Sequence, residues 1–264
     1  MQFFDLTRLR GVMAPQTFTA DGVYGDFQNS HNIAINETTG FAYAVGTNTC
    51  NGGLHMIDIR TPNNPMFAGC NALAETHDTQ CVVYAGPDPD HQNREICVSS
   101  NENHVGITDV TNKSSPMPLG NVVYPQLGYV HQGWLTEDHR YLLLGDELDE
   151  ISFGVGTRTH VLDVTNLDAP AYLYAAQSTS RAVDHNLYIR GNRVYQANYS
   201  SGLRVLEFGD LAANQIGEVA FFDTYPAHDS ATFDGAWSVY PYFPSGTIVV
   251  NDRANGLFVL ALGP

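Results

Sequence analysis

Residues 184–208, DHNLYIRGNRVYQANYSSGLRVLEF, read as three short strands joined by two tight turns. The strands are DHNLYI, RVYQAN and LRVLEF, and the turns are Arg-Gly-Asn and Ser-Ser-Gly. Their β-branched and aromatic residues follow the pattern of a pleated sheet and not the 3.6-residue period of a helix. Antiparallel neighbours bring the start of one strand beside the end of the next, so we expect His185 and Asn198 to lie together at one edge of the sheet.

The same unit recurs along the chain. Matching third strands are LHMIDI (54–59), VGITDV (105–110), THVLDV (159–164), LRVLEF (203–208) and LFVLAL (257–262). The first strands of the five copies open at His31, His77, His131, His185 and Trp237, with spacings of 46, 54, 54 and 52 residues. This period is typical of one four-stranded propeller blade. We therefore predict an all-β fold, a β-propeller of five four-stranded blades that forms a single domain over residues 1–264.

The two ends of the chain suggest how the ring closes. Residues 1–9 carry the third-strand pattern with no first or second strand before them, and residues 12–19 offer an outer strand. The fifth copy ends directly after its third strand. An N-terminal segment that completed the last blade would remove an exposed sheet edge. We expect the fifth blade to be closed in this way.

Composition excludes some classes of partner. The formal charge is −16 with only 12 Lys and Arg residues, whereas nucleic-acid binding needs a basic surface. No run of about 18 apolar residues is present, so we expect no membrane span. The N-terminus, MQFFDLTRLRGV, has no apolar leader. The acidic charge suits a secreted protein, although solubility alone also explains most of it.

The four cysteines allow three pairings. Cys81 follows His77 by four residues and Cys97 precedes Asn101 by four, so the two cysteines face each other if the hairpin pairs His77 with Asn101. Cys50 and Cys70 would then join a loop of the first blade to its outer strand. Four buried free thiols are the alternative, because cysteine is a good core residue. We favour two disulfides and hence an oxidising compartment, extracellular or periplasmic.

Several stretches resemble those of the secreted choice-of-anchor B, or LVIVD-repeat, β-propeller family. They include FDLTRLR, HNIAINETTGFAYAVG, GGLHMIDI, THDTQCVVYAGPD, REICVSSNE, HQGWLTEDHRYLLLGDELDE, DHNLYIRGN, NYSSGLRVLEF, FFDTYP and GAWSVYPYFPSG. The resemblance covers nearly the whole chain. It implies a propeller that is extracellular or anchored at the cell surface, and it implies no particular activity.

The histidines that open the first strands are the leading candidates for function. First strands line the central channel of a propeller, so equivalent positions form a ring. We expect His31, His77, His131 and His185 to converge there and to bind a divalent transition metal, Zn, Mn, Fe or Cu. The alternative is that each histidine only ties strands together. The other six histidines (55, 91, 104, 139, 160 and 228) lie in third strands or loops, and we expect them at the surface.

Acidic residues stand at the ends of the second strands, beside these openings. Four of them are candidates for general base or proton shuttle: Glu102, Asp146, Glu147 and Asp252. Asp78 and Asp184 adjoin ring histidines, and we expect them to orient imidazoles or backbone groups from outside the ligand set. Trp237, Asn198 and His228 are candidates for a substrate pocket.

These features favour an extracellular metal-dependent hydrolase that acts on a small phosphoester, lactone or ester. The metal would polarise a phosphoryl or carbonyl oxygen and acidify water. Two alternatives remain open. One is a non-catalytic surface or adhesion module stiffened by metal and disulfides, with cell-surface anchoring in longer relatives; the other is an oxidative enzyme that uses Cu or Fe.

Overall fold

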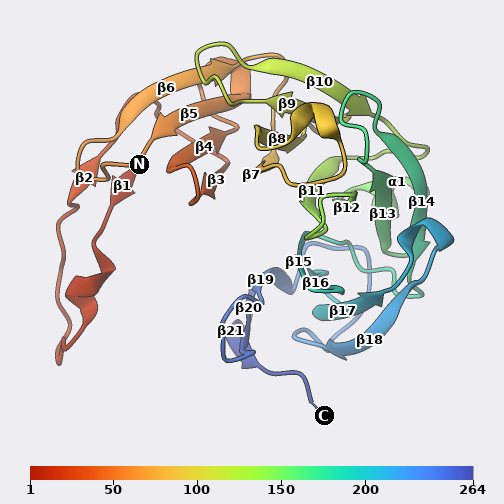
Figure 1. Cartoon of the computed structure of the whole chain (residues 1–264). Coiled ribbons are helices and arrows are strands. Elements are labelled where there is room, and N and C mark those ends of the chain that lie inside the picture. Colours follow the sequence, from red (N-terminus) through yellow and green to blue (C-terminus); the bar gives the residue numbers. More distant parts are fainter. Residues whose placement is uncertain (264) are drawn as a thin grey trace.

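The computed structural model describes residues 1–263 and confirms the β-propeller. Five antiparallel sheets follow one another in chain order around a common axis (Figure 1). The first blade consists of β3 (Asn32–Asn36), β4 (Phe41–Val45), β5 (Leu54–Asp58) and β6 (Met66–Asn71), and the second of β7 (Asp78–Val83), β8 (Glu95–Ser100), β9 (Val105–Asp109) and β10 (Met117–Val122). The third consists of β11 (Val130–Leu135), β12 (Tyr141–Asp146), β13 (Arg158–Asp163) and β14 (Ala171–Gln177), and the fourth of β15 (Asn186–Arg190), β16 (Arg193–Ala197), β17 (Leu203–Phe208) and β18 (Ile216–Phe222). The fifth consists of β19 (Ala236–Tyr240), β20 (Ile248–Asp252) and β21 (Gly256–Leu260). The first strands β3, β7, β11, β15 and β19 are innermost, and neighbouring blades contact each other through them.

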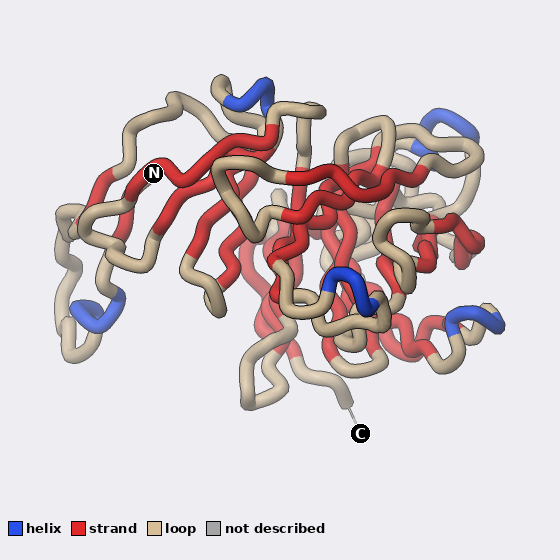
Figure 2. The backbone as a smooth tube through the Cα atoms, turned by 45° about the horizontal axis from the view of Figure 1, so that its top comes forward, coloured by secondary structure: helices blue, strands red, loops and turns tan. Residues whose placement is uncertain are grey.

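The helices are short and lie in the loops between strands (Figure 2). They are η1 (Leu6–Leu9), η2 (Cys50–Gly52), η3 (Pro89–His91), α1 (Asp149–Phe153) and η4 (Leu211–Ala213). Within the described residues, no helix has the length and apolar character needed to cross a membrane.

The N-terminal segment does not complete the fifth blade, so that expectation is wrong. β1 (Gln2–Phe3) pairs with β2 (Gly22–Val23) in a separate two-stranded sheet, and the fifth blade has three strands. The expected strand at 12–19 has no strand structure. The cause is apolar packing onto the first blade, because Phe3 and Tyr24 lie against buried Ala42 and Ile57. The N-terminal segment therefore packs on the first blade and not on the fifth.

Alternation along the central strands builds the core between blades. In β12, Leu142 and Leu144 pack toward the second blade, while Leu143 between them packs with Val161 and Leu187 toward the fourth. All three leucines are almost fully buried. Successive side chains of a strand point to opposite faces, so a strand between two blades needs apolar residues on both. Each leucine buried in this way contributes about 1.5–3 kcal/mol relative to exposure.

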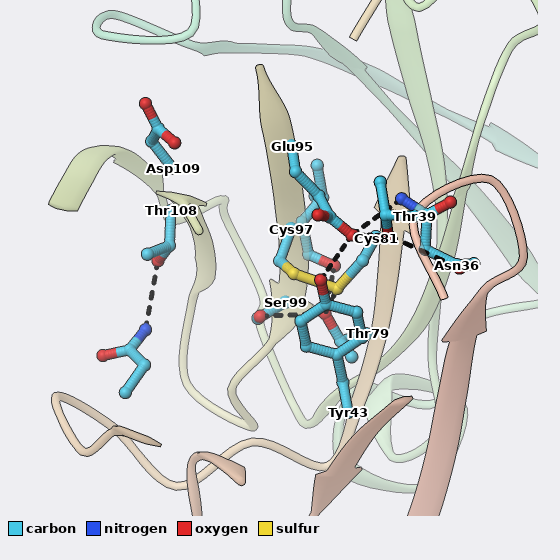
Figure 3. The surroundings of a disulfide bond; sticks show 12 residues. Asn36, Thr39, Tyr43, Thr79, Cys81, Glu95, Cys97, Ser99, Thr108 and Asp109 are labelled. Carbon is cyan, nitrogen blue, oxygen red and sulfur yellow. Dashed lines mark hydrogen bonds between the residues drawn. A yellow bond between two sulfur atoms is a disulfide. The ribbon is translucent and has the colours of Figure 1, made fainter. Parts of the chain in front are cut away.

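A buried carboxylate joins the first two blades. Glu95 accepts hydrogen bonds from Asn36 Nδ2 at 2.8 Å, Thr39 Oγ1 at 2.6 Å and Tyr43 Oη at 2.5 Å (Figure 3). Its other oxygen accepts from Lys113 Nζ at 2.6 Å, and both charged side chains are buried. A buried ion pair is tolerated only when its remaining lone pairs are bonded, as they are here. Glu95 therefore fixes the first blade against the second.

Both expected disulfides are present. Cys81 lies opposite Cys97 in the β7–β8 ladder, in the register that the mirrored spacing predicted, and their Cα atoms are 4.0 Å apart. Cys50 in η2 is joined to Cys70 in β6, with Cα atoms 5.4 Å apart. The second bond ties a loop to the outer strand of the first blade, also as predicted. Two disulfides favour an oxidising compartment.

The Cys81–Cys97 bond closes a loop of sequence separation 16 and is expected to stabilise the fold. Replacing both cysteines by alanine should lower the free energy of unfolding by about 3 kcal/mol, measured by denaturant titration. The unreduced, unfolded wild-type protein should contain no titratable thiol. Detection of free thiols in that sample would contradict the assigned pairing.

His55 supplies a pH-dependent contribution to stability. It is buried, and its Nε2 lies 2.7 Å from Tyr24 Oη and its Nδ1 2.7 Å from Thr49 Oγ1. Burial lowers its pKa below the ordinary 6.5. The unfolded chain therefore binds the proton more readily, and this stability is lost as pH falls below about 6.5.

The His55→Gln variant should consequently show a shallower decline in Tm than wild type between pH 7 and pH 5. The exposed His228→Gln variant is the matched control and should retain the wild-type slope. Equal slopes for all three proteins would refute the assignment of this pH dependence to His55.

Candidate functional site

The four predicted histidines and Trp237 form one continuous row at the inner ends of the blades. The ring centroids of His31 and His77 are 3.9 Å apart, and those of His77 and His131 are 4.3 Å apart. His131 and His185 follow at 4.3 Å, and His185 and Trp237 at 4.2 Å. Each residue opens the first strand of its blade, so the spacing of the row is the spacing of neighbouring blades. We call these five residues the histidine row.

Hydrogen bonds between blades fix the imidazoles. Nδ1 of His77 donates to the carbonyl oxygen of His131 at 3.1 Å, and Nδ1 of His131 donates to that of His185 at 3.1 Å. Nδ1 of His185 donates in the same way to the carbonyl oxygen of Trp237. A carbonyl can only accept, so Nδ1 carries the proton in all three rings. In a neutral ring, Nε2 then has a free lone pair, which is the form a metal ligand needs.

The environment keeps these rings neutral. Burial, with a further contribution from His31, lowers the pKa of His77 to about 4. Burial likewise lowers the pKa of His185 to about 4, and it holds the pKa of His131 well below 6.5. At neutral pH the three imidazoles are therefore uncharged.

Two of these rings share a carboxylate. His131 Nε2 lies 3.5 Å from Glu147 Oε2, and His185 Nε2 lies 3.8 Å from Glu147 Oε1. One ligand atom from each of the three residues lies within 4.8 Å of the other two. Tyr199 donates to Glu147 Oε1 at 2.6 Å and so holds the carboxylate in place, while burial raises the Glu147 pKa. Two imidazole nitrogens and one carboxylate could hold a divalent transition metal.

The other end of the row borders a cavity of about 400 Å³. His31, His77, Glu102 and Tyr129 line it, and Tyr129 Oη donates to Glu102 Oε1 at 2.9 Å. Glu102 has a positive φ of 63°, forms an isolated bridge with Val130 and lines this space. Here a small molecule would meet imidazoles, a carboxylate and a phenol.

Asp146 and Asp252 end the second strands of their blades, as predicted, but lie in different surroundings. Both are buried. Asp146 accepts from Tyr124 Oη and from the backbone N–H groups of Gly128, Tyr129 and Leu148, which are the contacts of a structural carboxylate. Asp252 Oδ1 accepts from two backbone N–H groups, and its Oδ2 has no partner.

The three predicted pocket residues lie in different surroundings. Trp237 continues the histidine row and is partly exposed, with the guanidinium of Arg253 over its ring at 5.4 Å. Asn198 is buried and lines a different cavity, of about 220 Å³, together with Thr159 and Arg204. His228 lies exposed in the loop before β19.

The two aspartates beside ring histidines also differ. Asp78 accepts from Asn32 Nδ2 of the neighbouring blade at 2.7 Å and from the backbone N–H of Thr79 at 2.6 Å. It therefore joins two blades through an asparagine side chain and not through a histidine. Burial raises its pKa to about 7. Asp184 is buried, and neither of its oxygens has a hydrogen-bond partner, whereas we expected it to bond a histidine or the backbone.

The expectation that the remaining histidines lie at the surface is wrong for three of them: His55, His91 and His160 are buried. His160 sits in β13, with Nε2 3.3 Å from Asp149 Oδ2. The sequence signal for its burial was its position between threonine and valine in THVLDV, because a strand covered on both faces buries all of its residues.

No family model matches the chain, and no curated protein matches it in sequence. The expected membership of the LVIVD-repeat family therefore stays a prediction. Solved structures do resemble it in fold. One is a protein from Lactobacillus plantarum, at 18% identity and a TM-score of 0.66, covering 94% of this chain and 71% of that one.

Two further neighbours carry names of lactone-hydrolysing enzymes. A periplasmic gluconolactonase of Pseudomonas aeruginosa has 15% identity and a TM-score of 0.54, over 80% of this chain and 60% of its own. A putative 6-phosphogluconolactonase of Bacteroides fragilis has 12% identity and a TM-score of 0.53, over 84% and 63%. The chain thus spans less than two thirds of the length of these two proteins. At such identities the likeness shows the fold alone.

The proton positions in the row are directly testable. In ¹⁵N-labelled protein at pH 6, correlation spectra of the imidazoles should show His77, His131 and His185 neutral with the proton on Nδ1, because that nitrogen donates to a carbonyl. Exposed His228 serves as the internal reference for an imidazole in contact with water. A proton on Nε2 of His131 would contradict the geometry.

Proposed function

We propose that the protein is a metal-dependent hydrolase of small lactones or phosphoesters whose metal is held by His131, His185 and Glu147. The observation that carries the proposal is the approach of two free Nε2 atoms to one carboxylate, at 3.5 and 3.8 Å. His31 and His77 continue the same row and would contribute at its open end. Zn, Mn, Fe and Cu all suit imidazole and carboxylate ligands, and the donor set does not choose between them.

Residues of the chain would orient the metal ligand, accept a proton and bind the substrate. The metal, when bound, supplies a Lewis acid that polarises a carbonyl or phosphoryl oxygen. Tyr199 orients Glu147, as a hydrogen bond to a ligating carboxylate does in many metal sites. Glu102, bonded to Tyr129 beside His77, is the acceptor we assign for the proton of the attacking water. The adjoining cavity of about 400 Å³ would receive the substrate.

The substrate class rests on analogy. Two structural neighbours are named as a gluconolactonase and a putative 6-phosphogluconolactonase. Their names motivate sugar lactones as first substrates, and the fold by itself does not fix activity. Phosphoesters remain the second class. We place the protein in the extracellular space or the periplasm because of its two disulfides, and we propose a small molecule and not a nucleic acid as its partner.

A non-catalytic binding module is the second candidate, and one observation favours it. Every ring nitrogen Nδ1 from His77 to His185 already bonds a carbonyl of the next blade, so the row joins blades without any metal. In that case the histidines serve the fold and the cavity serves recognition.

Metal analysis of the purified full chain distinguishes the two candidates. After incubation with Zn, Mn, Fe and Cu and removal of excess, one equivalent of metal should remain on the wild type. The His131→Ala, His185→Ala double variant and the isosteric Glu147→Gln variant should lose it, because each removes ligands from the set of three. Hydrolysis of gluconolactone and of an aryl phosphate is then measured in a pH-stat with the retained metal.

Exposed Glu37→Gln is the matched control and should retain both metal and any activity. If the wild type binds none of the four metals, the hydrolase proposal fails and the binding module replaces it. If metal binds but equally to Glu147→Gln and to the double variant, the site is elsewhere. Redox activity with Cu or Fe, without hydrolysis, would assign the protein to oxidative chemistry instead.

A further inference from the structure

A second acidic group lies in the interior, on the loops that follow β12 and precede β15. Asp149 and Glu150 begin α1, and Asp184 comes two residues before β15. Their exposed fractions are 0%, 1% and 2%. One oxygen from each lies within 4.8 Å of the other two. Three carboxyl groups this close and this dry repel one another strongly unless something neutralises them.

The protein supplies no hydrogen-bond partners for most of these oxygens. Asp149 Oδ1, both oxygens of Glu150 and both oxygens of Asp184 are buried and unbonded. Buried polar atoms are nearly always paired in folded proteins, so five unpaired oxygens in one place require an explanation. Glu95, which joins the first two blades, has hydrogen bonds on both of its oxygens, whereas these five oxygens have none.

Positive charge near the cluster is small. Arg158 Nη1 and His160 Nε2 approach Asp149 Oδ2 at 3.5 and 3.3 Å, on the oxygen that is not counted among the five. Asp146 adds a further buried carboxyl beside Asp149 and His160. One guanidinium therefore faces four acidic groups.

The backbone leaves room for this cluster to converge. A Cβ on Gly145 would lie 1.9 Å from Asp184 Oδ2, so only glycine allows the aspartate to approach β12. A Cβ on Gly128 would lie 2.8 Å from the backbone nitrogen of Asp149 and 2.9 Å from Asp146 Oδ1. Both glycines permit close approach of carboxylates that would otherwise be held apart.

We propose that Asp149, Glu150 and Asp184 bind a hard divalent cation, Ca²⁺, in a structural site separate from the histidine row. These three residues offer only oxygen donors, and Ca²⁺ takes six to eight oxygen ligands, with carboxylates binding through one or both atoms. One oxygen of each carboxyl lies within 4.8 Å of the other two, and the five unbonded oxygens are available as donors. An all-oxygen set selects against the metals that prefer imidazole, so the two sites differ in metal as well as in place.

A cation at this site would also restrain residues of the proposed transition-metal site. Asp184 precedes His185, and Asp149 follows Glu147 by two residues. A cation that joins Asp149 to Asp184 would therefore fix the two loops that carry His185 and Glu147. The inference stands without the proposed hydrolase, because it concerns the folding of these loops only.

The test uses the full chain, freed of metal with EDTA and then dialysed, at pH 7.5 and matched ionic strength. Addition of 1 mM CaCl₂ should raise Tm by about 5–10 °C, and calorimetry should give one bound Ca²⁺. Glu150→Gln and Asp184→Asn keep the side-chain shapes but remove charge. Each should weaken Ca²⁺ binding at least about tenfold and leave the Tm in EDTA unchanged or higher.

Exposed Asp90→Asn is the matched control and should respond to Ca²⁺ like the wild type. The His131→Ala, His185→Ala double variant should also keep the Ca²⁺ response, which separates this site from the proposed transition-metal site. The proposal is overturned if 1 mM CaCl₂ leaves the wild-type Tm unchanged. It is also overturned if both variants bind Ca²⁺ as tightly as the wild type.

Discussion

The hydrogen bond from an imidazole Nδ1 to the carbonyl of the next blade is the interaction on which the candidate site depends. It recurs from His77 to His131, from His131 to His185 and from His185 to Trp237. Each bond joins two blades at their innermost strands and selects one tautomer, with a free Nε2. The same hydrogen bond therefore joins neighbouring blades and prepares the imidazole to bind a metal. Because the proton is on Nδ1, Nε2 keeps its lone pair.

Burial extends this arrangement to the carboxylates. The low pKa values of His77 and His185, about 4 for each, follow from loss of water at the inner ends of the blades. The same desolvation raises the pKa of Glu147, and Tyr199 restrains it with a hydrogen bond. Neutral imidazoles beside a restrained carboxylate form a polar site whose charge a cation would balance. Burial is more complete in the cluster of Asp149, Glu150 and Asp184, where five carboxyl oxygens have no hydrogen-bond partner.

The sequence repeat made the blades and the histidine row predictable, because equivalent positions of the repeat lie at equivalent positions of the first strands. The pairing of Cys81 with Cys97 followed from the same register. The N-terminal segment was not predictable, because its choice between the first and last blades depends on apolar contacts such as Phe3 with the first blade. The acidic cluster was missed because Asp149 and Asp184 meet only through the approach of two loops. Roles assigned by strand position alone could not distinguish Glu147, beside two imidazoles, from Asp146, bonded to the backbone.

Anomalous X-ray diffraction from crystals soaked in Zn²⁺, collected above and below the zinc edge, tests the central claim most directly. The account predicts one strong peak in coordination distance of His131 Nε2, His185 Nε2 and a Glu147 oxygen. A map with no peak along the histidine row would contradict it, and the row would then be an interblade hydrogen-bond ladder without a metal.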